Sequence, residues 1–297
     1  MRPPFDWSLG TRSLSLGGRT LVMGIVNVTP DSFSDGGLYL DASKAVEHAL
    51  QLLDEGAEIL DIGGESTRPG ARAEAVSAQQ ELDRVLPVIE KVKRARPDAV
   101  VSVDTYKAAV ARACVEAGAE IVNDVSGGLW DEAMLSILAT LRCGVTLMHM
   151  RGRPEEWRTL PPIGDALAVV KQGLQERAQA ALRSGIEPSR MMLDPGFGFG
   201  KSFGENYPLL AHFKQFHELG YPLLAGVSRK SFLGRTLARR PEGSREAPEL
   251  APVGERLHAT LAAETALALQ GAHIIRTHDV RACADAVKIA DAILAAA

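Results

Sequence analysis

Residues 100–124 read VVSVDTYKAAVARACVEAGAEIVND and contain one complete unit of a pattern that runs through the chain. A short β-branched run, Val100–Asp104, precedes a segment of helical periodicity, Lys107–Ala117, and a second short run, Glu120–Asn123. This order predicts a strand, a helix and a second strand, which is the repeating unit of an α/β fold with parallel strands.

The same alternation continues in both directions along the chain. Further strands are predicted at Leu21–Asn27, Glu58–Ile62, Val145–Met148, Arg190–Asp194, Leu223–Val227 and His273–Arg276. Further helices are predicted at Ala42–Glu55, Ala78–Arg94, Ala166–Ser184, Arg256–Leu269 and Ala282–Ala295. Eight strands alternating with helices over 297 residues favour a (β/α)8 TIM barrel. A doubly wound open sheet is the alternative, because periodicity does not reveal whether a sheet closes.

The chain is predicted to form a single domain over residues 1–297, because no Pro/Ser-rich linker divides it. Residues 1–20 are an N-terminal extension before the first predicted strand. One stretch, Ala238–Gly254, is rich in Pro, Gly, Arg and Glu and follows the seventh strand. A stretch of this composition is expected as a surface insertion within the seventh unit.

The composition is that of a globular protein, with 46% hydrophobic and 24% charged residues. The net charge of −4 argues against a nucleic-acid-binding protein, which normally carries a basic surplus. The three cysteines form no C-x-x-C pair, so neither disulfides nor a zinc site is expected. Met1–Gly18 lacks the apolar core of a signal peptide, and no apolar run approaches the roughly 20 residues of a membrane helix. We therefore expect a cytoplasmic protein that does not contact membranes.

Polar residues stand where the predicted strands end, and in a TIM barrel the chemistry lies at those ends. One group offers carboxylates, an amide and an ammonium group to a flat, donor-rich heterocycle: Asp104, Asn123, Asp194 and Lys230. A second group suits an anion: Asn27, Arg68, Arg276 and His278. Any one of them alone is as well explained by a helix cap or a turn. Their convergence on one face weakens that explanation. Asp279, which follows the last predicted strand, is instead expected to cap the last helix.

Residues 196–202, GFGFGKS, follow a predicted strand and resemble a phosphate-binding P-loop. The Walker pattern requires a glycine five positions before the final Gly-Lys-Ser, and that position holds Pro195. The spacing therefore excludes an ATP-binding loop. The glycines are expected to let the backbone approach a planar ligand, with Phe199 covering it and Phe197 packing on the barrel.

Several segments, in this order, resemble the dihydropteroate synthase family. The two most specific are residues 24–37, GIVNVTPDSFSDGG, and residues 61–70, DIGGESTRPG. Shorter matches are residues 104–105 (DT), 123–124 (ND), 148–150 (MHM), 194–201 (DPGFGFGK), 228–232 (SRKSF) and 276–280 (RTHDV). The resemblance runs from residue 20 to the C-terminus.

The resemblance implies a reaction and a role for each matching residue. The family condenses (7,8-dihydropterin-6-yl)methyl diphosphate with 4-aminobenzoate and releases diphosphate. It implies pterin contacts at Asp104, Asn123, Asp194 and Lys230, with Met148 lining the pocket. Phe199, from the glycine-rich loop, is predicted to join this pterin site. It implies diphosphate contacts at Asn27, Thr67, Arg68, Arg276 and His278, with Mg²⁺ on Asn27. It implies 4-aminobenzoate contacts at Phe33, Pro69 and Ser231, the place that sulfonamides occupy in the family. The residues expected to be catalytic are Asp104, Lys230, Arg276 and His278.

Two other functions stay open. A pterin-binding methyl-transfer module that serves a corrinoid protein would share the barrel and the pterin pocket, but Arg68, Arg276 and His278 would have no diphosphate to bind. An inactive paralogue would keep every residue without turnover. The family also forms homodimers, and the Ala- and Leu-rich helices Arg256–Leu269 and Ala282–Ala295 suit such an interface.

Overall fold

The computed structural model describes residues 2–29, 38–65, 76–239 and 248–296, with the backbone alone for residues 38–41. The parallel strands are β3 (Leu21–Asn27), β4 (Ile59–Gly63), β5 (Val100–Asp104), β6 (Ile121–Asp124), β7 (Gly144–Met148), β8 (Met191–Asp194), β9 (Leu224–Ala225) and β10 (Ile274–Thr277). They form one eight-stranded sheet in the order β8-β7-β6-β5-β4-β3-β10-β9. A bridge between Leu193 and Leu223 joins its two edges. The prediction of a single (β/α)8 barrel is confirmed, and the open sheet is excluded.

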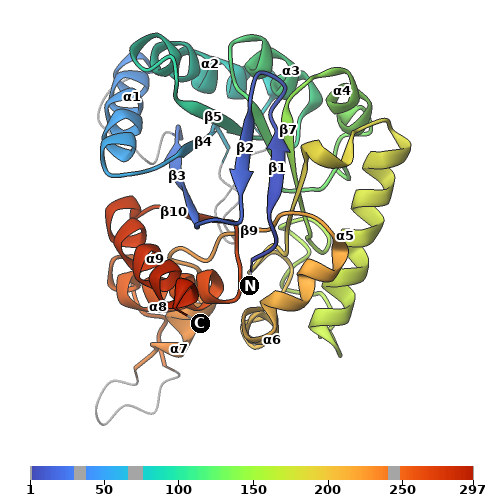
Figure 1. Ribbon diagram of the computed structural model, residues 1–297, viewed down its shortest axis with the longest axis vertical. Helices are drawn as coiled ribbons and strands as arrows, with labels where there is room; N and C mark the ends of the chain where they lie inside the picture. Colours follow the sequence, from blue (N-terminus) through green and yellow to red (C-terminus); the bar gives the residue numbers. More distant parts are fainter. Residues whose placement is uncertain (1, 30–37, 66–75, 240–247, 297) are drawn as a thin grey trace.

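Helices surround this barrel (Figure 1). They are α1 (Leu38–Asp54), α2 (Ala78–Ala95), α3 (Ala108–Glu116), α4 (Met134–Thr140), α5 (Ala166–Arg183), α6 (Asn206–Ala211), α7 (Ser231–Thr236), α8 (Leu257–Leu269) and α9 (Val280–Ala295). Three 3₁₀ segments, Pro188–Arg190, Phe213–Leu219 and Val253–Glu255, complete the described elements. Local sequence fixes where the longer helices begin: Ser77 and Gln80 form a capping box on α2, and Asp165 caps α5.

Apolar residues fill two layers of the barrel. The larger layer lies between the strands and the surrounding helices. The smaller layer lies inside the barrel and includes residues near the strand starts, such as Met23, Ile59 and Ile121. A packed interior of this kind leaves the opposite, C-terminal strand ends as the place for a ligand.

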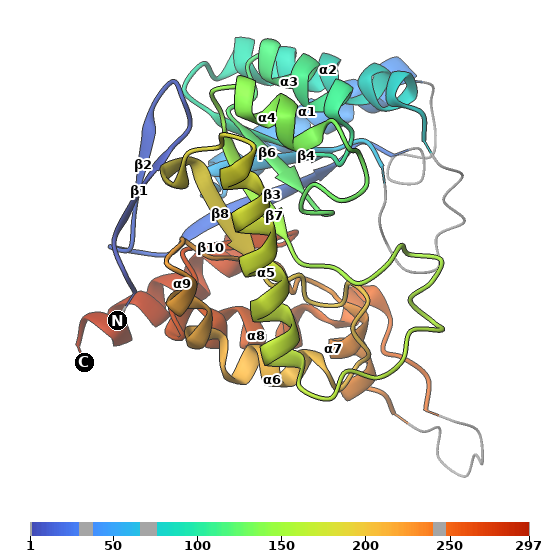
Figure 2. The ribbon, with the colours of Figure 1, turned by 90° about the vertical axis from the view of Figure 1, so that its right-hand side faces the viewer.

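The N-terminal extension is an antiparallel hairpin of β1 (Phe5–Ser8) and β2 (Ser13–Leu16) that packs against the inner layer. Trp7 is fully buried there, and its indole N–H donates to the backbone oxygen of Arg190 over 2.8 Å. The hairpin stands across one end of the barrel, on the left in Figure 2. It therefore closes the end at which the strands begin.

The region predicted as a surface insertion is described only outside residues 240–247. A bridge pairs Arg239 with Glu249, and the Ala251 N–H donates to the backbone oxygen of Gly234 at 3.0 Å.

Of the helices in the described ranges, none is both long and apolar enough to cross a membrane.

Candidate functional site

Strand register brings the polar strand ends to one level. Gly63 of β4 lies beside Asp104 of β5, and Asp104 lies beside Asn123 of β6. Farther round the barrel, Met148 of β7 lies beside Asp194 of β8. The residues predicted to hold the heterocycle therefore stand at the C-terminal strand ends.

An ion-pair network crosses the middle of this face. The Arg276 guanidinium, on β10, donates from Nε to Asp61 Oδ2 at 2.5 Å and from Nη2 to Asp104 Oδ2 at 2.7 Å. Asp61 is fully buried and also accepts from the Asn123 amide nitrogen at 3.0 Å. Arg276, which the sequence assigns to the anion, thus lies among the groups assigned to the heterocycle.

The carboxyl group of Asp104 is poised to titrate near neutral pH. Burial raises its pKa to about 7, and the nearby charges of Asp61, Glu81 and Asp124 act in the same direction. The Arg276 guanidinium opposes this by stabilising the ionised form. The protonation state of the Asp104 carboxyl near pH 7 therefore depends on Arg276.

Asp194 and Lys230 form the other side of the site. Asp194 accepts from the Gly196 N–H at 2.7 Å, while burial raises the pKa of its carboxyl and the Lys230 charge lowers it. Lys230 donates to the backbone oxygen of Phe197, and burial lowers its pKa to about 7. Its ammonium nitrogen lies 4.5 Å from the centre of the Phe199 ring. Phe199 therefore lies next to Lys230, and its contact with a pterin stays a prediction.

The loop GFGFGKS is unlike a P-loop in the structure as well. Lys201 is buried, and its ammonium group donates to the backbone oxygens of His149, Gly196 and Phe199 at 2.7 to 3.2 Å. An ammonium group satisfied by three carbonyls has no phosphate role.

Two glycines of this loop allow a close backbone approach that the sequence does not predict. A Cβ at Gly196 would lie 2.0 Å from the His149 oxygen, and one at Gly200 would lie 2.4 Å from the Arg151 oxygen. The close approach at these two glycines is to the neighbouring loop, and the approach of this loop to a planar ligand stays a prediction. Phe197 packs in a fully buried aromatic cluster with Phe213 and Phe232, as predicted.

The remaining described residues of the predicted anion and aminobenzoate sites follow β3, β9 and β10. Asn27 ends β3, and Ser231 begins α7. The His278 ring pairs through Nδ1 with the Ser228 hydroxyl at 2.9 Å. Four predicted site residues lie outside the described residues: Phe33, Thr67, Arg68 and Pro69.

Asp279 is structural, as expected, but by another contact. It precedes α9 and makes no side-chain hydrogen bond to the start of that helix. Its carboxylate instead binds the Arg229 guanidinium, from Nε at 2.9 Å and from Nη2 at 2.5 Å. Arg229 has a φ of 57°, so this ion pair stabilises an unusual turn directly before Lys230.

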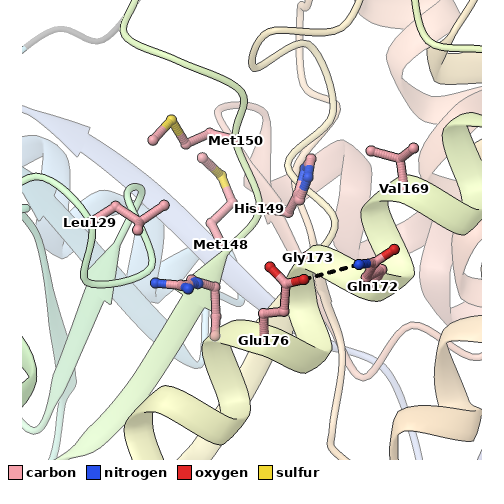
Figure 3. A pocket seen from close by; sticks show the side chains of 9 residues that line it. Leu129, Met148, His149, Met150, Val169, Gln172, Gly173 and Glu176 are labelled. Atoms are coloured by element: carbon pink, nitrogen blue, oxygen red, sulfur yellow. Dashed lines mark hydrogen bonds between the residues drawn. The ribbon is translucent and has the colours of Figure 1, made fainter.

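A cavity of about 330 Å³ lies beside the site, between the end of β7 and α5 (Figure 3). Its walls include Met148, His149 and Gly173, with Gln172 and Glu176 hydrogen-bonded to each other on α5. Of the predicted site residues that the structure describes, only Met148 lines it. The cavity therefore adjoins the predicted pterin pocket across this one side chain.

Sequence reasoning missed the residues that support the site from behind. Three of them contact predicted site residues, although the sequence identified them only as parts of motifs: Asp61, Ser228 and Lys201. Arg229 acts through Asp279, which holds the turn directly before Lys230. Asp61 had a usable signal: a carboxylate inside the apolar run ILDIG needs a buried partner. A strand packed only against apolar neighbours would offer the Asp61 carboxylate no such partner.

Comparisons with known proteins place this chain in a family. A family model described as "Pterin binding enzyme" matches residues 23–278. The dihydropteroate synthase of Escherichia coli K12 is 44% identical over 275 residues, covering 93% of this chain and 92% of its own.

Two solved structures are also similar. The dihydropteroate synthase of Xanthomonas albilineans with 4-aminobenzoic acid has a TM-score of 0.85 at 44% identity, and the alignment covers 99% of both chains. That of Yersinia pestis, in a complex with a sulfonamide drug, has a TM-score of 0.83 at 41% identity, with 95% of this chain and 97% of that chain covered.

Proposed function

Because the chain belongs to the pterin binding enzyme family, we propose that it is a dihydropteroate synthase, a transferase of folate biosynthesis. It condenses (7,8-dihydropterin-6-yl)methyl diphosphate with 4-aminobenzoate and gives 7,8-dihydropteroate and diphosphate. The observation that carries the proposal is the set of polar residues at the C-terminal strand ends: Arg276 pairs with Asp104, Asn123 lies beside Asp104, and Asp194 ends β8. Sulfonamides, as mimics of 4-aminobenzoate, are expected inhibitors.

The pterin lies against the carboxylates in this proposal. A pterin offers ring N–H and amino donors along one edge, and ionised Asp104 and Asp194 can only accept. Lys230 adds a donor for a ring oxygen or nitrogen, next to the Phe199 face. Each buried polar group of the pocket then gains a partner when the pterin binds.

The reaction replaces a carbon–oxygen bond by a carbon–nitrogen bond. The aniline nitrogen attacks the pterin methylene, the diphosphate leaves with the electron pair of the C–O bond, and the amine releases one proton. Since an aniline is neutral at pH 7, departure of the charged diphosphate is the harder step. Arg276 and His278 stabilise charge on the leaving oxygens, while Asp104 and Asp194 stabilise cationic character on the pterin.

Magnesium is part of this proposal, bound through the Asn27 amide oxygen. In the described ranges, no cluster of three or more His, Cys, Asp or Glu side chains could hold a metal ion. An amide oxygen nevertheless suits Mg²⁺, which commonly takes few protein ligands and completes its shell with phosphate oxygens and water. When bound, it supplies positive charge to the diphosphate.

A homodimer and a cytoplasmic setting complete the proposal. Ile289 and Ile293 lie one turn apart on α9 and are 62% and 52% exposed, an apolar stripe that suits a second copy of the chain. Cys114, Cys143 and Cys283 are buried free thiols, as expected for a protein of a reducing compartment.

The proposed function is tested by an assay of pyrophosphate release. Release must depend on the pterin diphosphate, on 4-aminobenzoate and on magnesium. A chain that binds pterin but releases no pyrophosphate would be an inactive paralogue, and methyl transfer to a corrinoid protein would point to the other alternative.

Calorimetry with Arg276→Ala tests the diphosphate assignment. The variant should lose on the order of 2–5 kcal/mol of affinity for the pterin diphosphate. Its loss for pterin without phosphate should be smaller, and equal losses would contradict the assignment.

A further inference from the structure

Asp61 is a charged side chain inside the barrel with every oxygen engaged. It lies in β4 and is fully buried, so a ligand at the barrel mouth does not reach it. Oδ1 accepts from the Ser102 hydroxyl at 2.6 Å. Oδ2 accepts from the Asn123 amide nitrogen at 3.0 Å and from Arg276 Nε at 2.5 Å. Three donors from β5, β6 and β10 thus converge on one carboxylate.

The contact with Asn123 fixes the direction of that amide. An ionised carboxylate accepts hydrogen bonds and cannot donate them, so the nitrogen of the amide must face Asp61. The carbonyl oxygen is then the group that Asn123 can offer to a ligand. Without Asp61, the amide could turn over and offer a donor in its place.

The contact with Arg276 fixes the plane of the guanidinium. Its Nε binds Asp61 while its Nη2 binds Asp104, so a single flat group bridges two carboxylates on neighbouring strands. The guanidinium is rigid, and holding one edge therefore determines where the other nitrogens lie. Asp61 in this way sets the distance from the Arg276 charge to Asp104.

We propose that Asp61 is a positioning residue for the substrate pocket, which fixes the Asn123 amide with its oxygen toward the ligand and holds Arg276 against Asp104. The role rests on the proposed function, because it assigns a donor-rich pterin to the acceptors so arranged. Asp61 thereby determines specificity without touching the substrate.

The variant that tests this role is Asp61→Asn, which keeps the size of the side chain and removes its charge. Ser102→Ala is the matched control, because the Ser102 hydroxyl contacts the other oxygen of the same carboxylate. For each protein, calorimetry gives the Kd of 6-hydroxymethylpterin, and kinetics give kcat and KM over a range of pH. Thermal unfolding reports the stability of each variant separately.

In Asp61→Asn, the Kd of 6-hydroxymethylpterin and the KM for the pterin diphosphate should both rise about tenfold or more. The acid limb of the kcat/KM profile should move to higher pH, because Arg276 lowers the pKa of Asp104 more than Asp61 raises it and is no longer held against that carboxyl. Ser102→Ala should keep the Kd within about twofold of the wild-type value and should leave the acid limb at the wild-type pH. A folded Asp61→Asn protein with wild-type Kd and acid limb, and only a lower melting temperature, would overturn the role.

A crystal structure of the wild-type chain with 6-hydroxymethylpterin provides a second test that does not depend on a variant folding. Asp61 should keep its contacts to Asn123 and Arg276 and stay out of reach of the pterin; a direct contact would overturn the role. The wild-type assay separates the two proposals. If the wild type releases no pyrophosphate, the proposed function is wrong. If the wild type is active and Asp61→Asn keeps its Kd and acid limb, only the positioning role is wrong.

Discussion

The ammonium nitrogen of Lys230 lies 4.5 Å from the centre of the Phe199 ring, and the edge of Trp157 packs on the same ring. The relationship joins the segment after β9 to the loop after β8. It also gives a partly desolvated cation a neighbour that favours its charged form, while burial lowers the Lys230 pKa to about 7. Phe199 therefore supports both the shape and the charge of the pocket.

Replacing Phe199 by Leu should weaken pterin binding. The loss of a cation–π contact of this kind is worth about 0.5–2 kcal/mol, or roughly two- to thirtyfold in Kd. Titration with 6-hydroxymethylpterin measures it. Phe203→Leu is the control, because Phe203 also lies near a cation, Arg235, but is 41% exposed. Equal effects of the two changes would contradict the assignment of Phe199 to the pocket.

Replacing Arg276 by Gln should move the acid limb of the kcat/KM profile to higher pH. Arg276 lowers the pKa of Asp104, which burial holds at about 7, so loss of the guanidinium raises that pKa. At pH 7 the carboxyl is then mostly protonated and is a poorer acceptor, and part of the activity should return at pH 9. The exposed Arg281→Gln serves as control. An acid limb that stays in place would rule out the coupling between Arg276 and Asp104.

Stability should fall as the pH drops from about 6.5 toward 4, in part because of His273. This buried ring accepts from the Leu223 N–H through Nδ1 and pairs with the Pro3 oxygen through Nε2, and burial lowers its pKa to about 4. Between the ordinary histidine pKa of about 6.5 and the native value of about 4, His273 is protonated in the unfolded chain but not in the native one. The free energy of unfolding then decreases by on the order of 3 kcal/mol.

His273→Asn keeps an acceptor near Leu223 and should flatten this pH dependence, as followed by urea unfolding at pH 7 and pH 4.5. It removes only part of the slope, because burial also lowers the pKa of His149, to about 2. His258→Asn, on an exposed residue, is the control. An unchanged slope in His273→Asn would show that this histidine does not carry the effect.

Truncating Trp7 should strongly destabilise the protein. Trp7 is fully buried in the inner layer, so Trp7→Ala removes packing and leaves the Arg190 oxygen without its donor, at a cost of about 3–5 kcal/mol. Ser15→Ala, which removes an exposed contact to Asp6 on the same hairpin, should cost less than about 0.5 kcal/mol. Similar urea midpoints for the two variants would mean that the hairpin is dispensable.

A charge on the exposed stripe of α9 should split the proposed dimer. Ile289→Lys would bury an ammonium group in an apolar interface, which is strongly unfavourable without a partner. Light scattering at micromolar concentration should show twice the chain mass for the wild type and a single chain mass for the variant. A wild-type monomer would refute the dimer.

Periodicity sufficed for the barrel but not for its short elements. The strands Leu21–Asn27 and Val100–Asp104 were predicted to the residue, because long apolar runs bounded by polar residues have few alternative structures. Helices α4, α6 and α7 have six or seven residues each, less than two turns, and give no periodic signal. The hairpin of β1 and β2 was missed for the same reason.

Residue types predicted which groups gather at the site, but not which of them pair. Arg276 was sorted with the anion-binding residues, since an arginine near a proposed diphosphate is expected to face it. In the structure its long side chain pairs with Asp61 and Asp104, and only the closed sheet brings those three strands into reach. The contact of Arg276 with a diphosphate stays a prediction. Pairing across a barrel depends on closure, which a linear pattern does not contain.

The hairpin that covers the strand starts has a consequence for molecular traffic. Trp7, Leu9 and Leu16 close that end of the barrel. The predicted substrate pocket is therefore expected to open to solvent on one side only, at the C-terminal strand ends. Both substrates must enter and both products must leave through the same opening. If one substrate binds deeper in the barrel mouth than the other, we expect the deeper one to bind first and to leave last.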